Sequence, residues 1–230
     1  MSELIDTTEM YLKAIYELQE SGHVAVRARI AERLDQAAPT VSQTVARMER
    51  DGLLILDEDK VLNFTEYGAD LAVSVMRKHR LAERLLIDVL GFDWASCHEE
   101  ACHWEHVISD EAEIRIAQKL TTLTHDPFGN PIPGLEELGF SIEPYLPAKR
   151  SISEMPLAVD ENQIAKLIAV GESAQARDGF LTKLVEAKIQ LNSDISITKT
   201  KTGFNIKALN TETSVSLDNL LAEYLYIATN

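Results

Sequence analysis

The sequence predicts a mainly helical chain with a small β component: a winged helix-turn-helix, then a helical domain, then a small β-barrel. Three observations predict it. Two short helical patterns joined by a tight turn precede a hairpin, longer helical patterns follow, and the last part alternates short apolar runs with turns. With 230 residues, 45% of them hydrophobic, the chain has enough apolar material for more than one folded domain.

Three helices are predicted in the first part, over residues 6–21, 27–34 and 39–50. Asp6 or Thr7 can cap the first, Pro39 is a favoured first helical residue, and Asp51-Gly52 stops the third. The third helix has an apolar face formed by Val41, Val45 and Met48 and a polar face formed by Thr40, Gln43, Thr44 and Arg47. Two short helices with this arrangement are typical of a helix-turn-helix, whose second helix lies on DNA.

A β-hairpin directly follows this pair. Residues 53–56 and 61–64 are apolar runs on either side of the turn at residues 57–60. A hairpin in this place is the wing of a winged helix.

The middle and last parts show different periodicities. Helices are predicted over residues 65–91, 94–108 and 109–120, and residues 125–134 are rich in turn-forming residues. Short apolar runs at residues 164–170, 188–191, 195–198, 204–209 and 220–228 predict a small β-barrel. We therefore expect a DNA-binding domain over residues 1–73, a helical domain over 74–140, a linker over 141–156 and a β domain over 157–230.

The charge balance restricts how such a chain binds nucleic acid. The formal net charge of −15 disfavours a broad basic surface, because duplex affinity comes largely from lysine and arginine on phosphates. Five arginines nevertheless gather in one short stretch of the first part, at positions 27, 29, 33, 47 and 50. We expect DNA binding that depends on exact placement of a few side chains.

Two features indicate the cytoplasm. The sequence has no run of 18 apolar residues, and its first residues lack the basic start and apolar stretch of a signal peptide. Cys97 and Cys102 are five apart in a predicted helix and point to different faces, so a mutual disulfide is not expected. No membrane partner is expected.

Residues that bind soft or borderline metals are concentrated between positions 79 and 106. His79 and Glu83 are four apart on one helix, while Cys102 is followed at three and four residues by Glu105 and His106. Thiolate, imidazole and carboxylate together suit Fe²⁺, Co²⁺, Ni²⁺ or Zn²⁺ rather than Mg²⁺ or Ca²⁺. His98 lies one turn before Cys102, and spacing alone leaves open whether it joins the Cys102 group or the His79 pair.

An enzyme is the competing class of protein. Cys102 and His106, four apart, have the spacing of a nucleophile and a base on one helix, or a bound metal activates water. Catalysis by a metal requires an open coordination position. Reactivity of Cys102 toward a thiol reagent that is unaffected by metal would favour the enzyme.

Several stretches resemble the diphtheria toxin repressor and iron-dependent regulator family, which comprises metal-dependent winged-helix repressors of actinobacteria. The resemblance covers roughly the first 140 residues and is weak beyond them. It rests on DTTEMYL at residues 6–12, RARIAERL at 27–34, PTVSQTVARMERDGL at 39–53, VMRKHRLAERL at 75–85, EACHWEHV at 100–107 and PFGNPIPG at 127–134.

The resemblance implies two metal sites per chain and an SH3-like fold for the last domain. The primary, activating site matches Met10, Cys102, Glu105 and His106. The ancillary site matches His79, Glu83 and His98, with Glu172 and Gln175 as the best match in the divergent tail. The resemblance thus assigns His98 to the His79 pair. A metal held by Met10 and by Cys102 would tie the first helix to the helical domain.

Fe²⁺ is the expected physiological co-repressor, because a site of Met, Cys, Glu and His is softer than the carboxylate-rich sites expected of manganese sensors. Co²⁺, Ni²⁺, Mn²⁺ and Zn²⁺ are expected to substitute in vitro. A manganese or zinc sensor of related build is the alternative within regulators.

On DNA, the helix that begins at Pro39 is expected to enter the major groove. Gln43 is the best candidate for reading a base edge, Pro39 and Ala37 are placed to contact thymine methyl groups, and Thr40 lies on the same outer face. Phosphate contacts are expected from Arg27, Ser42, Arg47 and Arg50. A homodimer is expected to bind an inverted-repeat operator, with one or two dimers on each operator.

Two positions depart from the family pattern. Ala37-Ala38 replaces the usual Ser-Gly, and the lost serine hydroxyl touches the operator in the family. His103 replaces an arginine beside the primary site, and this replacement is expected to add pH sensitivity.

Overall fold

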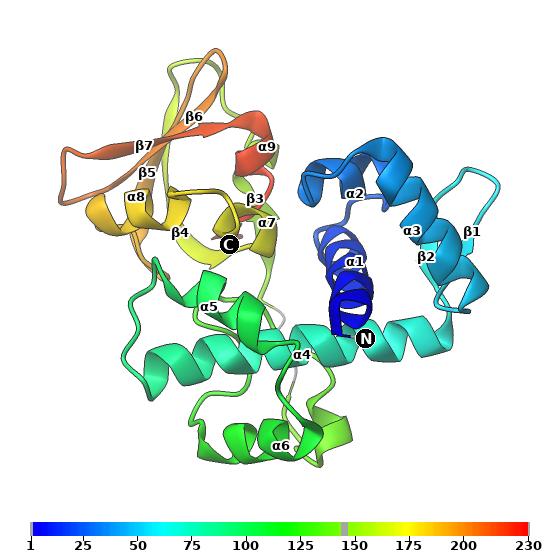
Figure 1. Ribbon diagram of the computed structural model, residues 1–230. Coiled ribbons are helices and arrows are strands. Elements are labelled where there is room, and N and C mark those ends of the chain that lie inside the picture. The colour runs from blue at the N-terminus through cyan, green and yellow to red at the C-terminus, as the bar shows by residue number, and fades with distance from the viewer. Residues whose placement is uncertain (1, 144–146, 230) are drawn as a thin grey trace.

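The computed structural model describes residues 2–143 and 147–229, with side chains from residue 7 onward. Residues 144–146 of the expected linker lie outside the described residues. Figure 1 shows one long helix, α4 (Glu66–Asp88), running beneath the rest of the molecule. The helices and hairpin of the first part stand over one half of α4, and α5 and the C-terminal sheet stand over the other half.

The first part has the predicted winged-helix arrangement. Its elements are α1 (Ser2–Glu20), α2 (Arg27–Arg33), α3 (Ala38–Arg50), β1 (Leu54–Leu56) and β2 (Leu62–Phe64). The last four start or end within one residue of their predicted positions. The expected start of the first helix at residue 6 is wrong, because α1 already begins at Ser2. Gly22, with φ of +75°, ends α1 in the left-handed conformation that glycine adopts without strain.

One residue of α3 lies on the wrong face in the sequence prediction. Thr44 is buried beside Val45 and Met48, although we expected it on the polar face. It follows Gln43 by one position, and a rotation of about 100° per residue takes it from the outer face to the edge of the core.

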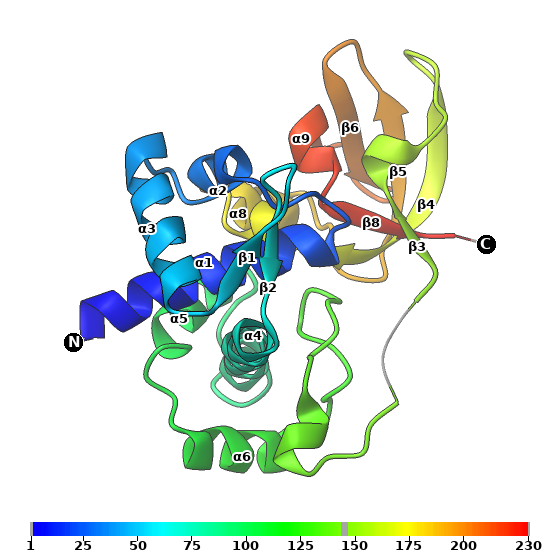
Figure 2. The ribbon, with the colours of Figure 1, turned by 90° about the vertical axis from the view of Figure 1, so that its right-hand side faces the viewer.

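Three helical elements surround α4 in the middle part, namely α5 (Cys97–Trp104), α6 (Asp110–Lys119) and the 3₁₀ turn η1 (Leu135–Leu138). Figure 2 views α4 end-on and shows α6 beneath it. α5 is shorter than the predicted 94–108. The Asp93 carboxylate accepts hydrogen bonds from Ser96 N and Ser96 Oγ, which makes a turn before the helix. After it, extended Ser109 caps α6 with its hydroxyl.

The last part is a six-stranded antiparallel half-barrel. Strand order is β3-β8-β4-β5-β6-β7. The elements are β3 (Lys149–Ser151), the 3₁₀ turn η2 (Ile152–Glu154), β4 (Asn162–Val170), α7 (Glu172–Gln175), α8 (Phe180–Glu186), β5 (Asp194–Lys199), β6 (Gly203–Ala208), β7 (Ser214–Asp218), α9 (Asn219–Ala222) and β8 (Leu225–Ala228). Both β3 and η2 fall inside the range 141–156 that we expected to be a linker.

Two of the apolar runs predicted as strands are not continuous strands. Residues 188–191 form a loop, because Lys188 and nearby Asn192 adopt φ of +56° and +65°. The run at 220–228 divides into α9 and β8, since the Asp218 carboxylate accepts the Leu221 N–H and caps a short helix. The short helices α7 and α8 follow β4 and were not predicted.

The half-barrel does not have a core of its own. One continuous cluster of buried residues joins Leu86 of α4 and Cys97 and Ala101 of α5 to Phe128 and to the sheet interior, including Leu167, Ile195 and Phe204. A separate cluster fills the winged helix, with Tyr11, Ile15, Val41 and Leu62 among its members. The C-terminal part is therefore packed rigidly on α4 and α5. Among the described residues, no helix combines the length and apolarity that crossing a bilayer requires.

Candidate metal centre

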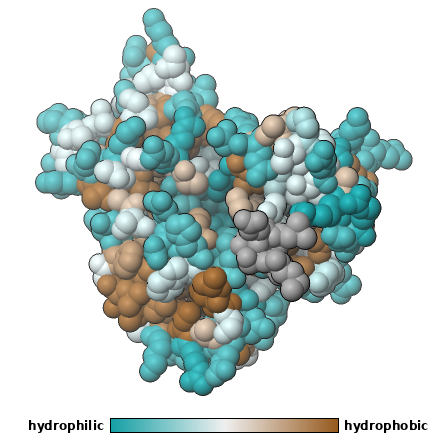
Figure 3. Space-filling view, in the orientation of Figure 1, coloured by the Kyte–Doolittle hydropathy of each residue, from teal (hydrophilic) through white to brown (hydrophobic). Residues whose placement is uncertain are grey.

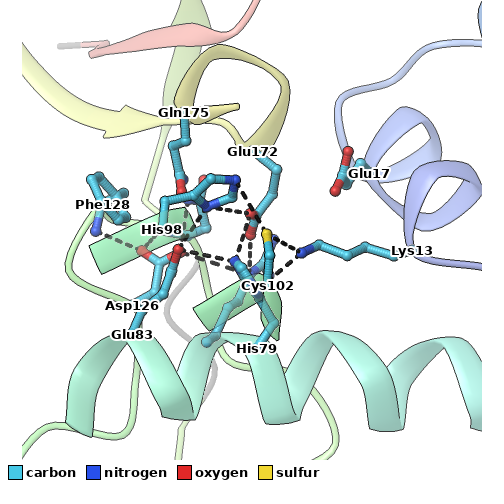
Figure 4. Close-up of polar contacts among 12 residues, drawn as sticks. Lys13, Glu17, His79, Glu83, His98, Cys102, Asp126, Phe128, Glu172 and Gln175 are labelled. Carbon is cyan, nitrogen blue, oxygen red and sulfur yellow. Dashed lines mark hydrogen bonds and ion pairs between the residues drawn. The ribbon is translucent and has the colours of Figure 1, made fainter. Parts of the chain in front are cut away.

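Four buried side chains from three helices meet where α4, α5 and α7 come together. They are His79 and Glu83 on α4, His98 on α5 and Glu172 on α7, and one ligand atom from each lies within 4.8 Å of the others. His79 Nε2 is 2.9 Å from Glu83 Oε1 and 3.1 Å from Glu172 Oε2. His98 Nδ1 is 3.0 Å from Glu83 Oε1. Figure 4 shows the four side chains converging on one point. We call them the inner cluster.

Several polar atoms of the inner cluster lack hydrogen bonds in the described structure. Among them are His79 Nε2, Glu83 Oε2 and Glu172 Oε2, together with Oε1 of the neighbouring Gln175. The Gln175 amide nitrogen donates to Val170 O at 2.7 Å, which leaves its oxygen turned toward the cluster (Figure 4). Buried oxygens without partners are costly. A divalent cation with nitrogen and oxygen ligands would satisfy all four atoms, so the residues present fit a metal.

The inner cluster is held in place by buried arginine. Arg80, next to His79 on α4, donates to Glu172 Oε1 at 3.0 Å and to the Glu20 carboxylate of α1 at 2.6 and 2.9 Å. Fixing one oxygen of Glu172 leaves Oε2 free to face the histidines. Sequence reasoning missed this role, because an arginine beside a predicted ligand looks like any charged helical residue.

The charges of the cluster balance one another without metal. Burial and nearby Lys13 would lower the pKa of His79, but Glu83, Glu172 and Glu105 raise it well above its ordinary value. For His98, burial is outweighed by Cys102 and Glu83, and its pKa rises to about 9. Against burial, His79 lowers the pKa of both Glu83 and Glu172. Because a residue must be deprotonated to bind a metal, metal binding in this cluster would compete with protons.

The second predicted set, Met10, Cys102, Glu105 and His106, lines a pocket of about 320 Å³ between α1 and α5. We call it the α1–α5 pocket. These residues are not gathered around one point as those of the inner cluster are. Met10 is 40% exposed, and His106 Nδ1 is 2.5 Å from Glu9 Oε2 of α1. The expectation that Cys102, Glu105 and His106 share one helix is wrong: α5 ends at Trp104, Glu105 caps it, and His106 lies in the next turn.

The amino group of Lys13 occupies the junction between the pocket and the inner cluster. Lys13 Nζ lies 2.8 Å from Glu105 Oε2, 3.5 Å from Cys102 Sγ and 2.9 Å from His79 Nδ1 (Figure 4). Lys13 is only 6% exposed. Burial would lower its pKa, yet Cys102 and Glu105 raise the pKa above its usual value. Sequence reasoning missed Lys13; its spacing of three residues from Met10 was the available signal.

Cys102 lies in an electropositive environment. Burial alone would raise the pKa of its thiol, but Lys13, His98 and His79 lower the pKa well below its ordinary value. Sγ is 3.7 Å from His98 Nε2, while His98 Nδ1 faces Glu83. His98 thus contacts both groups that spacing left as alternatives. A thiolate is the form in which cysteine binds a metal.

The outer face of α3 carries most of the predicted DNA contacts. Exposed residues there are Ala37 at its cap, Pro39, Thr40, Ser42, Gln43 and Arg50. Arg47 is half-buried and donates to Thr8 Oγ1 of α1 at 3.5 Å, and Arg27 is half-buried at the start of α2. The outer face of α3 is therefore exposed and mostly polar beyond Pro39, and Arg47, one of its predicted phosphate-binding residues, is in contact with α1.

Comparison with known proteins relates both regions to one family. Residues 3–62 match the model described as "Iron dependent repressor, N-terminal DNA binding domain". Residues 65–134 match "Iron dependent repressor, metal binding and dimerisation domain".

Individual relatives extend the similarity over most of the chain. The diphtheria toxin repressor of Corynebacterium diphtheriae is 50% identical over 201 residues, which is 86% of each chain. The iron-dependent repressor IdeR of Mycobacterium tuberculosis is 49% identical over 203 residues, 88% of each chain. Among solved structures, IdeR of T. acidophilum superposes with a TM-score of 0.71 at 26% identity, covering 96% of this chain and 97% of that one.

Proposed function

This chain belongs to the iron-dependent repressor family, and from that premise we propose that it is a transcriptional repressor that binds its operator when a divalent metal, Fe²⁺, is bound. The observation that carries the proposal is the junction of α1, α4, α5 and α7. There, buried side chains suited to binding a metal lie against α1, the helix that packs in the core of the winged helix.

We assign two metal sites to each chain. The inner cluster with Gln175 forms the ancillary site, because its ligand atoms are buried and close together and one side-chain atom each of His79, Glu83, Glu172 and Gln175 lacks a hydrogen bond among the described residues. The residues Met10, Cys102, Glu105 and His106 of the α1–α5 pocket form the primary site. When bound, a divalent cation would neutralise the negative charge of these carboxylates and of the Cys102 thiolate. The soft sulfur donors favour Fe²⁺, with Co²⁺, Ni²⁺, Mn²⁺ and Zn²⁺ as substitutes in vitro.

The chain's residues couple metal to DNA through α1. Met10 lies on α1, which packs in the core of the winged helix, whereas Cys102 lies on α5. A ligand set completed by residues from both elements ties them together and favours the arrangement in which it is complete. α3 moves with α1, because both belong to one core and Arg47 contacts Thr8.

On DNA, α3 enters the major groove. Gln43 is exposed and reads a base edge, and Pro39, Ala37 and Thr40 approach the bases beside it. Arg27, Ser42, Arg47 and Arg50 hold phosphates and set the register.

The repressor acts as a homodimer. An apolar patch formed by Val89, Leu90 and Phe92 lies exposed in the segment between α4 and α5. Figure 3 shows hydrophobic residues gathered over this end of the molecule. A patch of this kind marks an interface. Because a two-fold dimer reads two-fold symmetric DNA, the operator is an inverted repeat that takes one or two dimers.

The enzyme alternative has little support in the geometry. Cys102 Sγ is partnered by Lys13 and His98, while His106 is paired with Glu9 and Glu105. The two residues that would act as nucleophile and base therefore face different partners.

The test is an anaerobic mobility-shift assay with inverted-repeat DNA at one salt concentration, with Fe²⁺, with Mn²⁺, with Zn²⁺ and with a chelator. Fe²⁺ is expected to tighten binding by at least about a hundredfold over the chelated protein. Equal binding by the chelated protein would refute metal activation. Activation by Mn²⁺ or Zn²⁺ at a lower free metal concentration than Fe²⁺ requires would support the alternative, a manganese or zinc sensor.

The reading residues are tested by a matched pair of variants. Gln43→Ala is expected to relax sequence preference, with a loss of about 1–3 kcal/mol on the preferred operator and little on others. Arg47→Ala is expected to weaken binding to all duplexes alike and to lower the salt slope by about one. An unchanged preference in the Gln43 variant would remove its assigned role.

A further inference from the structure

The ammonium group of Lys13 lies among the side chains that would bind the metal of the primary site. It contacts Glu105 Oε2 at 2.8 Å and Cys102 Sγ at 3.5 Å, two atoms assigned to the primary site, and it lies 2.9 Å from His79 Nδ1 of the ancillary site. With 6% of Lys13 exposed, these contacts are made out of reach of bulk water. Figure 4 shows its side chain crossing from α1 to reach them.

An ammonium group and a divalent cation are both stabilised by negatively charged thiolate and carboxylate groups. A metal ligated by Cys102 and Glu105 would place two positive charges within contact distance of Lys13 Nζ. Repulsion at that separation in a buried site is strong, because little water screens it. The ammonium must therefore leave these atoms when the metal arrives.

Lys13 also shares a helical face with Met10, since the two are three residues apart on α1. Both line the α1–α5 pocket, and Met10 is 40% exposed there. Without metal, the contact from α1 to Cys102 and Glu105 is thus made by Lys13. With metal, the contact would pass to Met10, one turn nearer the start of the helix.

The pocket has space for the displaced side chain. Its lining includes Glu17, one turn after Lys13 on the same helix, whose carboxylate already binds Arg33 at 2.7 Å. A four-carbon stem swings about its rotatable bonds, so Nζ has a second acidic partner on α1.

We propose that Lys13 is an internal competitor of the metal: its ammonium occupies the primary site in the metal-free protein and sets the metal concentration at which the repressor is activated. This inference rests on the proposed function, because it takes Cys102 and Glu105 as ligands of the activating metal.

The test is an anaerobic Co²⁺ titration of the full-length protein, followed by the thiolate-to-cobalt charge-transfer absorbance, which reports occupancy at Cys102 alone. Lys13→Leu removes the charge without adding a metal donor and is expected to bind Co²⁺ at least about tenfold more tightly than wild type, while Lys13→Arg stays within about threefold. Lys119→Leu, at an exposed lysine of α6, changes net charge equally and serves as the control with no effect.

Each outcome decides one question. Equal or weaker Co²⁺ binding by folded Lys13→Leu, with Lys13→Gln agreeing, overturns the inference while leaving the proposed function standing. Absence of the charge-transfer band in wild type would instead mean that Cys102 is not a ligand, and the proposed primary site would fail. Circular dichroism of each variant before titration identifies the folded ones, and Lys13→Gln takes the place of Lys13→Leu if the latter unfolds.

Discussion

The inner cluster and the α1–α5 pocket lie side by side yet differ in how far they are prepared for a metal. The inner cluster has four ligand-bearing side chains within 4.8 Å and several buried atoms without hydrogen bonds among the described residues. In the pocket, Glu105 and Cys102 are engaged by Lys13, His106 by Glu9, and Met10 remains 40% exposed.

The difference separates two tasks. A preformed site binds with little rearrangement and adds stability, but a ligand that fits both states equally shifts nothing. A site that must be rebuilt binds more weakly and changes the structure as it fills. We therefore expect the regulatory response to come from the pocket and not from the inner cluster.

Loss of the thiolate is expected to have the largest effect. Cys102→Ala removes the soft donor of the rebuilt site, and operator affinity at saturating Fe²⁺ should fall by at least about a hundredfold, or about 2.7 kcal/mol. Mobility shifts measure it. Cys97→Ala, which alters a buried thiol that packs in the core, is the control and should retain the wild-type response. Normal repression by the Cys102 variant would contradict the assignment of the regulatory response to the α1–α5 pocket.

Removal of the α1 ligand should come next. Met10→Ala is expected to weaken the activating metal by roughly tenfold to a hundredfold, since a thioether is a weaker donor than a thiolate. Calorimetric titration with Co²⁺ resolves the two sites. Met10→Leu keeps the apolar volume without sulfur, so equal weakening in both variants indicates ligation, whereas a wild-type result for Leu would show that Met10 acts only by packing.

A change in the preformed site should leave activation largely intact. Glu172→Gln keeps the shape of the side chain but removes its charge, and should weaken the ancillary metal about tenfold while changing the Cys102 site by less than about threefold. Glu186→Gln, exposed on α8, is the matched control. A larger loss at the Cys102 site than at the ancillary site would show that the two sites act as one.

The smallest expected effect is on the metal-free fold. The pKa of His98 is about 9, above its ordinary 6.5, so its protonation stabilises the fold fully below pH 6.5 and this stabilisation disappears as the pH rises through 9. The shifted pKa values of His79 and Cys102 also make stability depend on pH, so His98 is measured as the difference in urea-unfolding free energy between wild type and His98→Gln. That difference should fall by about 1 kcal/mol between about pH 7.5 and about pH 8.5. A difference that does not change with pH would assign the pH dependence to other groups.

Local spacing predicted the pair His79 and Glu83, because residues four apart meet on one helix. The same spacing drew attention to Cys102, Glu105 and His106, although only Cys102 of these lies within α5. Glu172 and Gln175 came only from the resemblance, because α7 has four residues and no periodicity to detect.

The contributions of Lys13 and Arg80 were missed for a different reason. Each is a charged residue on a helix, which usually means a solvated face, and its burial follows from elements far away in the sequence. Lys13 is covered by α5, more than eighty residues later, and Arg80 by α7. The start of α5 was misplaced because hydrogen bonds from Ser96 to the Asp93 side chain form a turn there instead of a helical turn.

The core that α4 and α5 share with the half-barrel decides how the tail should be studied. A chain cut before β3 would expose Leu86, Cys97, Ala101 and Phe128 to water. Such a fragment would aggregate or rearrange through this exposed apolar surface, whatever the C-terminal part contributes to regulation. Single substitutions at Glu172 and Gln175 are the better test, because they remove the metal ligands of the C-terminal part while its fold remains in place.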